Sequence, residues 1–337
     1  MSPRSTDALK SKNARMAEKL LTWEFLIFVI FVLVMVVDSL LSPYFLDWAN
    51  LFDATFNFME KAIIAMPMIF VIICGDIDIS VASIIALSSL MMGLASEHGA
   101  GTPILILIGV ASGFLCGLFN GLLITRLDIP AIAVTLGSMS LFRGVAAAVL
   151  GDGVYKKYPE SFGFFGQGYA IGYLVPFELI LFIVMAVITV VILNKTVYGR
   201  YLYAIGNNKT AAKFSGVPVQ KVRLIAFILT GVCSGIAAIL FTSRIGSTRS
   251  NIASGWELDV IMTVVLGGVA ITGGKGNVLG VVIASFLVGY MKFGMGVINV
   301  PGKVMNIITG ILLVVAILLP RTVDKLRNRA LLRQTEE

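Results

Sequence analysis

The chain has 337 residues, of which 58% are hydrophobic and only 13% are charged, with a formal net charge of +7. The charged share is about half of the roughly 25% usual in soluble domains, and a chain of this size could not hide so much apolar surface in one core. The composition therefore excludes a soluble protein and predicts an all-α, polytopic membrane protein. Its basic residues flank apolar runs instead of mixing with aromatic residues in a soluble domain, so we expect no nucleic-acid binding.

About ten apolar segments follow one another, most of them close to the roughly 20 residues that a membrane-crossing helix needs. The first is expected to be retained, since it is longer than the apolar part of a signal peptide and no small-residue cleavage site follows it. The predicted segments are 23–41, 60–75, 79–95, 103–124, 130–150, 173–194, 222–242, 258–273, 277–297 and 303–320.

Basic residues gather in three places: in the first 20 residues, between 195 and 223, and after Pro320. Cytoplasmic loops carry such an excess of Lys and Arg, and an even number of spans puts all three clusters on one side. We therefore predict cytoplasmic termini. The expected organisation is an N-terminal tail (1–22), a transmembrane domain (23–320) with a cytoplasmic coupling loop (195–221), and a C-terminal tail (321–337).

Two of the predicted segments, 60–75 and 258–273, are short and end in glycine-containing breaks at 75–80 and 272–277. Short, Gly-interrupted segments in both halves of a transporter point to its substrate path. Ordinary tight turns at the membrane surface are the alternative. The breaks do not correspond under a five-plus-five repeat, so they predict no internal symmetry.

The first break carries two carboxylates, Asp76 and Asp78, followed by Ser80. A carboxylate at membrane depth costs about 2.5–3.5 kcal/mol, so it is usually kept where it faces a water-filled path or a partner. Hydroxyl groups donate to carboxylates, which favours a polyol such as a sugar, while coupled protons are the other option. Gly75 can also end one helix and Ser80 or Asp78 can cap the next, which is the purely structural interpretation.

Three further polar residues belong to the predicted substrate path. Asn120 interrupts an apolar stripe, where a hydrogen bond between helices is the alternative role. Thr135 and Arg143 lie in the predicted segment 130–150. Arg143 can extend its charge to the membrane surface or pair with an acid such as Asp76 or Glu257.

The polar stretch 199–217 predicts a short cytoplasmic helix between two spans. Asn207 or Asn208 can cap a helix from 209 to 215, and Gly216 can end it. We expect this segment to dock a soluble partner, because a loop of more than about 15 residues is long for a simple connector. The predicted coupling residues are Gly206, Asn207, Asn208, Ala211, Ala212 and Gly216.

No pattern predicts a metal, a cofactor or a catalytic residue. The three cysteines lie in apolar runs without CxxC spacing, and His98 is the single histidine. Residues 268–276 contain the Gly-Lys pair of a phosphate-binding loop, but Val269 stands at the leading glycine and Gly276 at the hydroxyl position. We therefore expect no ATPase activity. Elsewhere, Gly113, Gly117 and Gly231 belong to small-residue patterns that allow helices to pack closely.

The chain resembles the permease subunits of monosaccharide ABC importers, the ribose-permease-like family, and the similar motifs occur in the same order from about residue 25 to 320. The stretches that carry the resemblance are Gly75-Asp76-Ile77-Asp78-Ile79-Ser80-Val81-Ala82, 134–144, 196–200, 204–208, 211–212, 263–268 and 273–276. Asp76 and Ala82 depart from it, because glycine is frequent at the first position and usual at the second.

The resemblance implies a multi-pass permease of the bacterial cell inner membrane that moves a monosaccharide or sugar-like solute. The implied partners are an ATP-binding cassette subunit, a second permease subunit (identical or related), an extracytoplasmic sugar-binding protein and the lipid bilayer. Pentoses, hexoses, deoxyhexoses, polyols and autoinducer-2 all remain possible cargoes. The alternatives are an ion-coupled secondary transporter that uses Asp76 and Asp78 and, less favoured, an intramembrane enzyme.

Overall fold

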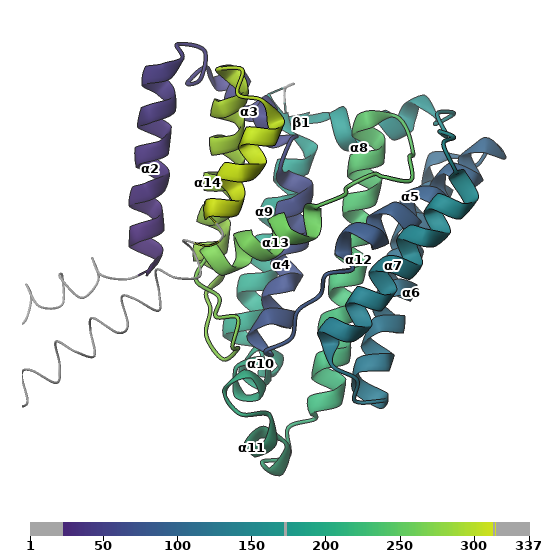
Figure 1. Cartoon of the computed structure of the whole chain (residues 1–337), viewed down its shortest axis with the longest axis vertical. Helices are drawn as coiled ribbons and strands as arrows, with labels where there is room; N and C mark the ends of the chain where they lie inside the picture. The colour runs from purple at the N-terminus through teal and green to yellow at the C-terminus, as the bar shows by residue number, and fades with distance from the viewer. Residues whose placement is uncertain (1–22, 172–173, 313, 315–337) are drawn as a thin grey trace, which may run out of the picture.

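A computed structural model describes residues 23–171, 174–312 and 314, and the predicted tails at 1–22 and 321–337 lie outside these residues. Figure 1 shows a bundle of helices with little other regular structure. The helices are α2 (Trp23–Leu41), α3 (Trp48–Thr55), α4 (Met59–Ile73), α5 (Val81–Glu97), α6 (Thr102–Arg126), α7 (Ala131–Leu150), η1 (Glu160–Gly163), α8 (Phe164–Gln167), α9 (Phe177–Lys195), α10 (Val197–Asn207), α11 (Lys209–Phe214), α12 (Val219–Ile245), α13 (Trp256–Leu266) and α14 (Val278–Val297), followed by Gly302–Leu312.

Six helices are long and apolar enough to cross a membrane, and the pair α3 and α4, bent by 54°, gives a seventh candidate span. The prediction of a helical polytopic membrane protein is confirmed at this level. The prediction of about ten segments, some of them short, is not tested in full: α5 and α13 are shorter than a full span, and the predicted segment 303–320 lies partly outside the described residues, which include its helix Gly302–Leu312. The all-α prediction also missed a small antiparallel pair of strands, β1 (Tyr169–Ile171) and β2 (Val175–Pro176).

The predicted segment 258–273 differs most from the structure. Helix α13 ends at Leu266, and Gly268 adopts a left-handed φ of 90°. Its amide donates to Val265, and that of Val269 donates to Val264, which is the Schellman arrangement that ends helices. The backbone therefore leaves the helix well before the predicted end.

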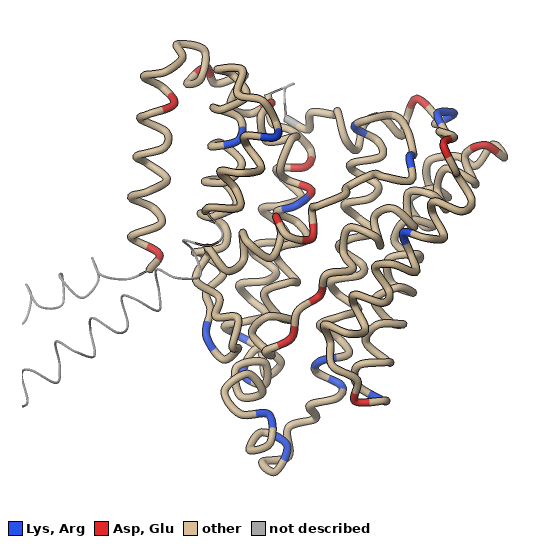
Figure 2. The backbone as a smooth tube through the Cα atoms, in the orientation of Figure 1, with Lys and Arg blue, Asp and Glu red and all other residues tan. Residues whose placement is uncertain are grey.

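The bundle has two distinct ends. Figure 1 places α10 and α11 at one end, here called the α11 pole, and α3 and α8 at the other, here called the α3 pole. Figure 2 shows Lys and Arg positions around α10, α11 and the adjoining start of α12. The predicted coupling loop at 195–221 contains α10 and α11 and is mostly helical. The sequence predicted a helix only in its second half.

Helix α4 forms the centre of the bundle. All of its residues except Lys61 are buried, and it packs against α9, α12, α13 and α14. A helix that is apolar on every side is stable only when other helices surround it. At the edge of the bundle, α2 stands beside α14 with most of its apolar surface exposed.

The closest helix packing joins α6 to α12. A Cβ atom added to Gly113 would overlap the carbonyl oxygen of Gly231, and one added to Gly231 would overlap that of Gly113. Gly117 and Gly235 contact the facing backbone in the same way. The prediction that small residues bring these helices together is confirmed.

Candidate functional site

The first break begins where α4 ends. Gly75 has a left-handed φ of 81°, its amide donates to Ile72, and the amide of Asp76 donates to Val71. These two hydrogen bonds form a Schellman motif, so the expected role of Gly75 in ending the helix is confirmed. The chain then runs without regular structure to α5, which begins at Val81.

The two breaks contact each other directly, a contact that the sequence analysis did not predict. The amide of Gly274 donates to the carbonyl of Ile73 at 2.9 Å. A Cβ atom on Gly273 would lie 2.9 Å from the amide nitrogen of Gly75 and 3.1 Å from the Cα of Gly206. We call these five residues the break junction.

Gly206, one of the predicted coupling residues, lies against both breaks. A Cβ atom there would overlap the carbonyl oxygen of Ile73 and lie 2.9 Å from the Cα of Gly274. The residue is therefore wedged between the two breaks, and its surroundings argue against a place on an exposed docking surface. The end of α10 thus touches both breaks in the membrane domain.

Asp78, Ser80 and Asn120 form one buried network. Oδ1 of Asp78 accepts from the amide of Ser80 at 2.9 Å and from its hydroxyl at 2.6 Å, and Nδ2 of Asn120 donates to Ser80 Oγ at 2.8 Å. Ser80 is the N-cap residue of α5, but its side chain makes no capping hydrogen bond. The Asp78 side chain instead holds the turn that leads into α5. The hydroxyl of Ser80 joins Asp78 to Asn120 on α6.

Two acceptors of this network have no donor. Oδ2 of Asp78 and Oδ1 of Asn120 are buried and receive no hydrogen bond within the described part of the chain. Thr135 reaches the same break, because its hydroxyl lies 3.4 Å from the carbonyl of Ile77 while also donating within α7. Four predicted path residues are therefore in one place. A role in conducting solute stays a prediction, because Asp78, Ser80 and Asn120 are fully buried here.

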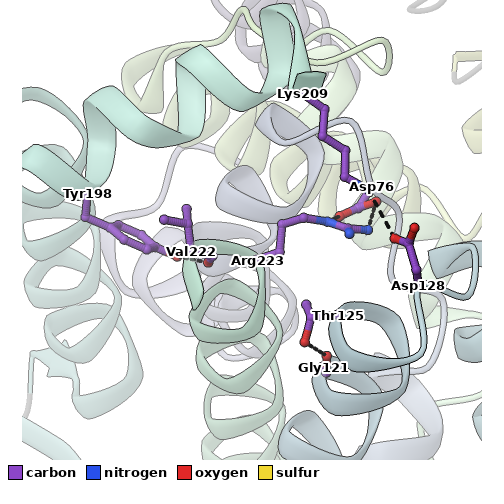
Figure 3. A network of polar contacts seen from close by, with 8 residues as sticks. All are labelled: Asp76, Gly121, Thr125, Asp128, Tyr198, Lys209, Val222 and Arg223. Atoms are coloured by element: carbon purple, nitrogen blue, oxygen red, sulfur yellow. Dashed lines mark hydrogen bonds and ion pairs between the residues drawn. The ribbon is translucent and has the colours of Figure 1, made fainter. Parts of the chain in front are cut away.

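Asp76 makes no hydrogen bond to this network and instead pairs with Arg223 on α12 (Figure 3). Nε of Arg223 donates to Oδ2 at 2.6 Å and Nη2 donates to Oδ1 at 2.9 Å, which is a two-pronged ion pair. The sequence interpretation had placed Arg223 only among the cytoplasmic basic residues. Asp76 was considered instead as a partner for Arg143, which the structure contradicts.

Arg143 lies elsewhere. It donates to the carbonyl oxygens of Ser250 and Ile252 at 3.2 and 2.6 Å. It shares a cavity of about 390 Å³ with Glu257, the other acid considered for it. Arg143 therefore does not belong to the cluster of the four path residues described above.

The predicted coupling helix is present as α11. Oδ1 of Asn208 accepts from the amide of Ala211 at 2.9 Å, as an N-cap should, and Gly216 has a φ of 83° that ends the helix. Asn207 belongs to α10 and donates to Tyr203. Ala212 packs inward, whereas Ala211 is exposed.

Helix α11 is also tied to the membrane helices. Nζ of Lys209 lies 3.4 Å from Oδ1 of Asp128, in the turn between α6 and α7 (Figure 3). Phe214, the last residue of α11, is 87% exposed. This exposed aromatic side chain was not among the predicted coupling residues, although its position within the predicted helix could have indicated it.

Two groups of charged side chains inside the bundle were also missed. Glu60, which is fully buried, accepts from Arg244 at 2.7 Å, and Glu178 is buried beside this pair without a hydrogen bond among the described residues. The second group is Lys61, Asp259 and Lys292. Lys292, five residues before the end of α14, was the clearest available signal, because charges inside apolar spans mark functional positions.

Membrane-length helices around two broken helices that meet at their breaks are typical of a membrane transport protein. Residues 50–317 match the family model described as "Branched-chain amino acid transport system / permease component", and the chain belongs to this family of permeases. No solved structure matches the chain significantly.

Two similar proteins cover nearly the whole chain. The ribose import permease protein RbsC of Bacillus subtilis is 35% identical over 294 residues, which is 87% of this chain and 90% of that protein. The autoinducer 2 import system permease protein LsrD of Escherichia coli K12 is 33% identical over 302 residues, 88% of this chain and 91% of that protein. The chain is thus a multi-pass ABC-importer permease of the bacterial cytoplasmic membrane, and it is not itself an ATPase.

Proposed function

We propose that the chain imports a monosaccharide or a sugar-like solute. The observation that carries this proposal is the similarity, at 33–35% identity over nearly nine-tenths of the chain, to permeases named for ribose and autoinducer 2. The permease family itself extends to branched-chain amino acid systems, so family membership alone does not select a sugar. The cargo assignment therefore depends on the relatives.

The α11 pole faces the cytoplasm in this proposal, with both termini on the same side. Support comes from the basic residues around α10 and α11, because cytoplasmic loops carry an excess of Lys and Arg. The α3 pole then faces outward, where a solute-binding protein delivers the cargo. A second permease subunit, identical or related, completes the pathway.

Helix α11 is the docking element for a separate ATPase subunit. Its exposed Phe214 provides an apolar contact, and Lys209 ties α11 to the α6–α7 turn through Asp128. Helix α10, which precedes α11, ends against both breaks at Gly206. A displacement of α11 during the ATPase cycle thus acts on the break junction, where the pathway switches between inward-open and outward-open states.

The function is tested by reconstitution in vesicles. With the ATPase subunit, the binding protein and ATP, the chain should accumulate D-ribose or autoinducer 2, and without ATP it should not. The ion-coupled alternative predicts accumulation by the chain alone under a proton or sodium gradient. Such uptake, independent of any ATPase, would contradict the proposal.

Replacing Phe214 by serine should weaken docking of the ATPase subunit. Truncating an aromatic anchor at an interface costs about 2 kcal/mol or more, which corresponds to roughly 30-fold in affinity. The measurement is the amount of ATPase subunit that co-purifies with the permease. Leu174→Ser is the control, since Leu174 is also an exposed apolar residue, at 60%, but does not belong to α10 or α11. Equal co-purification of both variants would refute docking through Phe214.

Asp78→Asn should lower uptake by about tenfold, which corresponds to about 1.4 kcal/mol, without loss of subunit assembly. The asparagine Oδ1 can still accept from the amide and hydroxyl of Ser80, so the turn into α5 is kept while the charge is removed. Asp47→Asn is the matched control, because Asp47 makes the same kind of turn with the amide of Ala49 at the start of α3. Loss of assembly in Asp78→Asn would favour a purely structural role.

A further inference from the structure

A second polar cluster lies where α4, α13 and α14 meet, away from the break junction. Nζ of Lys61 and Nζ of Lys292 both donate to Oδ2 of Asp259, at 2.6 and 2.9 Å. The three side chains keep 20%, 23% and 19% of their surface accessible. The cluster carries one net positive charge.

These side chains line a cavity of about 450 Å³, which is in the usual range of roughly 300–1,000 Å³ for small-molecule sites. Its walls combine the three charged groups with other polar side chains and with two phenyl rings. The additional lining residues used below are Asn57, Thr263, Ser285, Phe58, Phe293 and Gly296.

The cavity presents both donors and acceptors. Each ammonium group has three N–H donors, of which the bond to Asp259 uses one, and both lysines bind the same carboxylate oxygen. Among the described residues this leaves Oδ1 of Asp259 for another donor. The hydroxyls of Thr263 and Ser285 donate to carbonyls of their own helices and keep their oxygen lone pairs as acceptors.

A hydroxylated solute matches this chemistry. Each hydroxyl group of a polyol donates one hydrogen bond and accepts others, so it can use the ammonium donors and the carboxylate acceptor together. The phenyl rings of Phe58 and Phe293 offer apolar surface for the C–H faces of the same solute. The net positive charge admits a neutral or singly negative molecule and disfavours a cation.

The cavity lies at the end of α4 that is remote from the breaks. Lys61 is the third residue of α4 and Ile73 is the last, so they are separated by about 18 Å at 1.5 Å per residue. Asn57, on the cavity wall, belongs to the turn between α3 and α4 at the α3 pole. The buried helix α4 therefore connects the cavity to the break junction.

We propose that this cavity is a binding site for a small hydroxylated solute, neutral or singly negative, near the α3 pole of the permease. The inference rests on the proposed function, because it places a first solute site on the outward side of the pathway. It assigns Lys61, Asp259 and Lys292 as the solute-binding groups. A charge cluster with a purely structural role needs no accessible cavity in front of it.

Saturation-transfer NMR on the full-length permease in nanodiscs tests the site, with D-ribose, D-xylose and D-galactose as probes and choline as a cation of similar size. The sugar that binds should do so about tenfold more weakly in Gly296→Leu, whose side chain fills the cavity. A Cβ atom on Gly296 meets only Met305, at 3.9 Å, so the backbone has room for the substitution. Gly310→Leu is the control, since nothing lies within 4 Å of a Cβ atom there.

A second variant, Asp259→Asn, keeps the shape of the cavity and should also weaken binding. Equal sugar signals in Gly296→Leu and Gly310→Leu, a choline signal as strong as that of the sugars, or no sugar signal in the unmodified chain would each overturn the proposal. So would an anionic lipid that native mass spectrometry detects on the unmodified chain but not on Gly296→Leu, because the cavity would then hold a lipid phosphate.

The uptake assay separates this inference from the proposed function. ATP-driven uptake of a sugar without binding in the cavity would refute the site and leave the function standing. Binding in the cavity without ATP-driven uptake would refute the function and leave the site standing. The two measurements are independent because nanodisc binding requires neither the ATPase subunit nor the binding protein.

Discussion

Replacing Gly231 by alanine should strongly destabilise the bundle. The new Cβ atom would overlap the carbonyl oxygen of Gly113 and lie 2.7 Å from the Cα of Gly117. Both neighbours are backbone atoms, so no side chain can move aside and the two helices have to separate. Overpacking typically costs about 1–3 kcal/mol, and here the separation extends along the interface.

The measurement is the thermal unfolding temperature of the purified permease together with its yield of monodisperse protein. Gly137→Ala is the matched control, since Gly137 is a helical glycine in α7 with nothing within 4 Å of a Cβ atom. Alanine favours the helix over glycine by about 1 kcal/mol, so this control should be neutral or slightly stabilising. An unchanged unfolding temperature in Gly231→Ala would mean that the interface tolerates a wider separation.

The features that the sequence predicted well depend on neighbouring residues. The cap at Asn208 and the helix ends at Gly75 and Gly216 need only a few consecutive residues and their backbone angles. Small residues repeated every four positions likewise describe one face of one helix, and this face does pack closely. Fold class and family followed from such local patterns and from motifs in their order.

The features that were missed depend on distant segments. Asp76 and Arg223 are 147 residues apart in sequence, and the partners Lys61 and Asp259 are 198 apart. Nothing in a single sequence states which helices become neighbours, so Arg143 was considered for Asp76. The contact between the two breaks was not predicted either, because it joins distant segments through backbone atoms and carries no side-chain signature.

Hydropathy also placed some boundaries of the predicted spans inaccurately. Apolar composition continues beyond the point where the helix ends, as it does after Leu266 in α13. Conversely, the polar composition of 195–221 predicts a loop, whereas the first half of this stretch forms α10, which packs against α9, α12 and α4. Hydropathy reports where a segment is apolar, whereas the glycines decide where its hydrogen bonding stops.

Arg223→Met should be strongly destabilising, because it leaves the Asp76 carboxylate without its partner. The side chains of Arg223 and Asp76 are only 7% and 13% exposed, and removing one member of a buried ion pair costs about 3–5 kcal/mol. The double variant Asp76→Leu with Arg223→Met should recover most of this loss, since it removes both buried charges. Unfolding temperatures of the two single variants and the double variant give the coupling between the residues.

Lys209→Met is the control for the ion pair, because Lys209 and Asp128 are 52% and 83% exposed and their interaction contributes at most about 1 kcal/mol.

Uptake by the double variant separates a structural role of Asp76 from a role in the solute path. Since Arg223 already occupies both carboxylate oxygens, we expect the stable double variant to retain uptake, with Asp76 serving to hold α12 against the first break. Normal stability combined with lost uptake would instead make Asp76 part of the solute path.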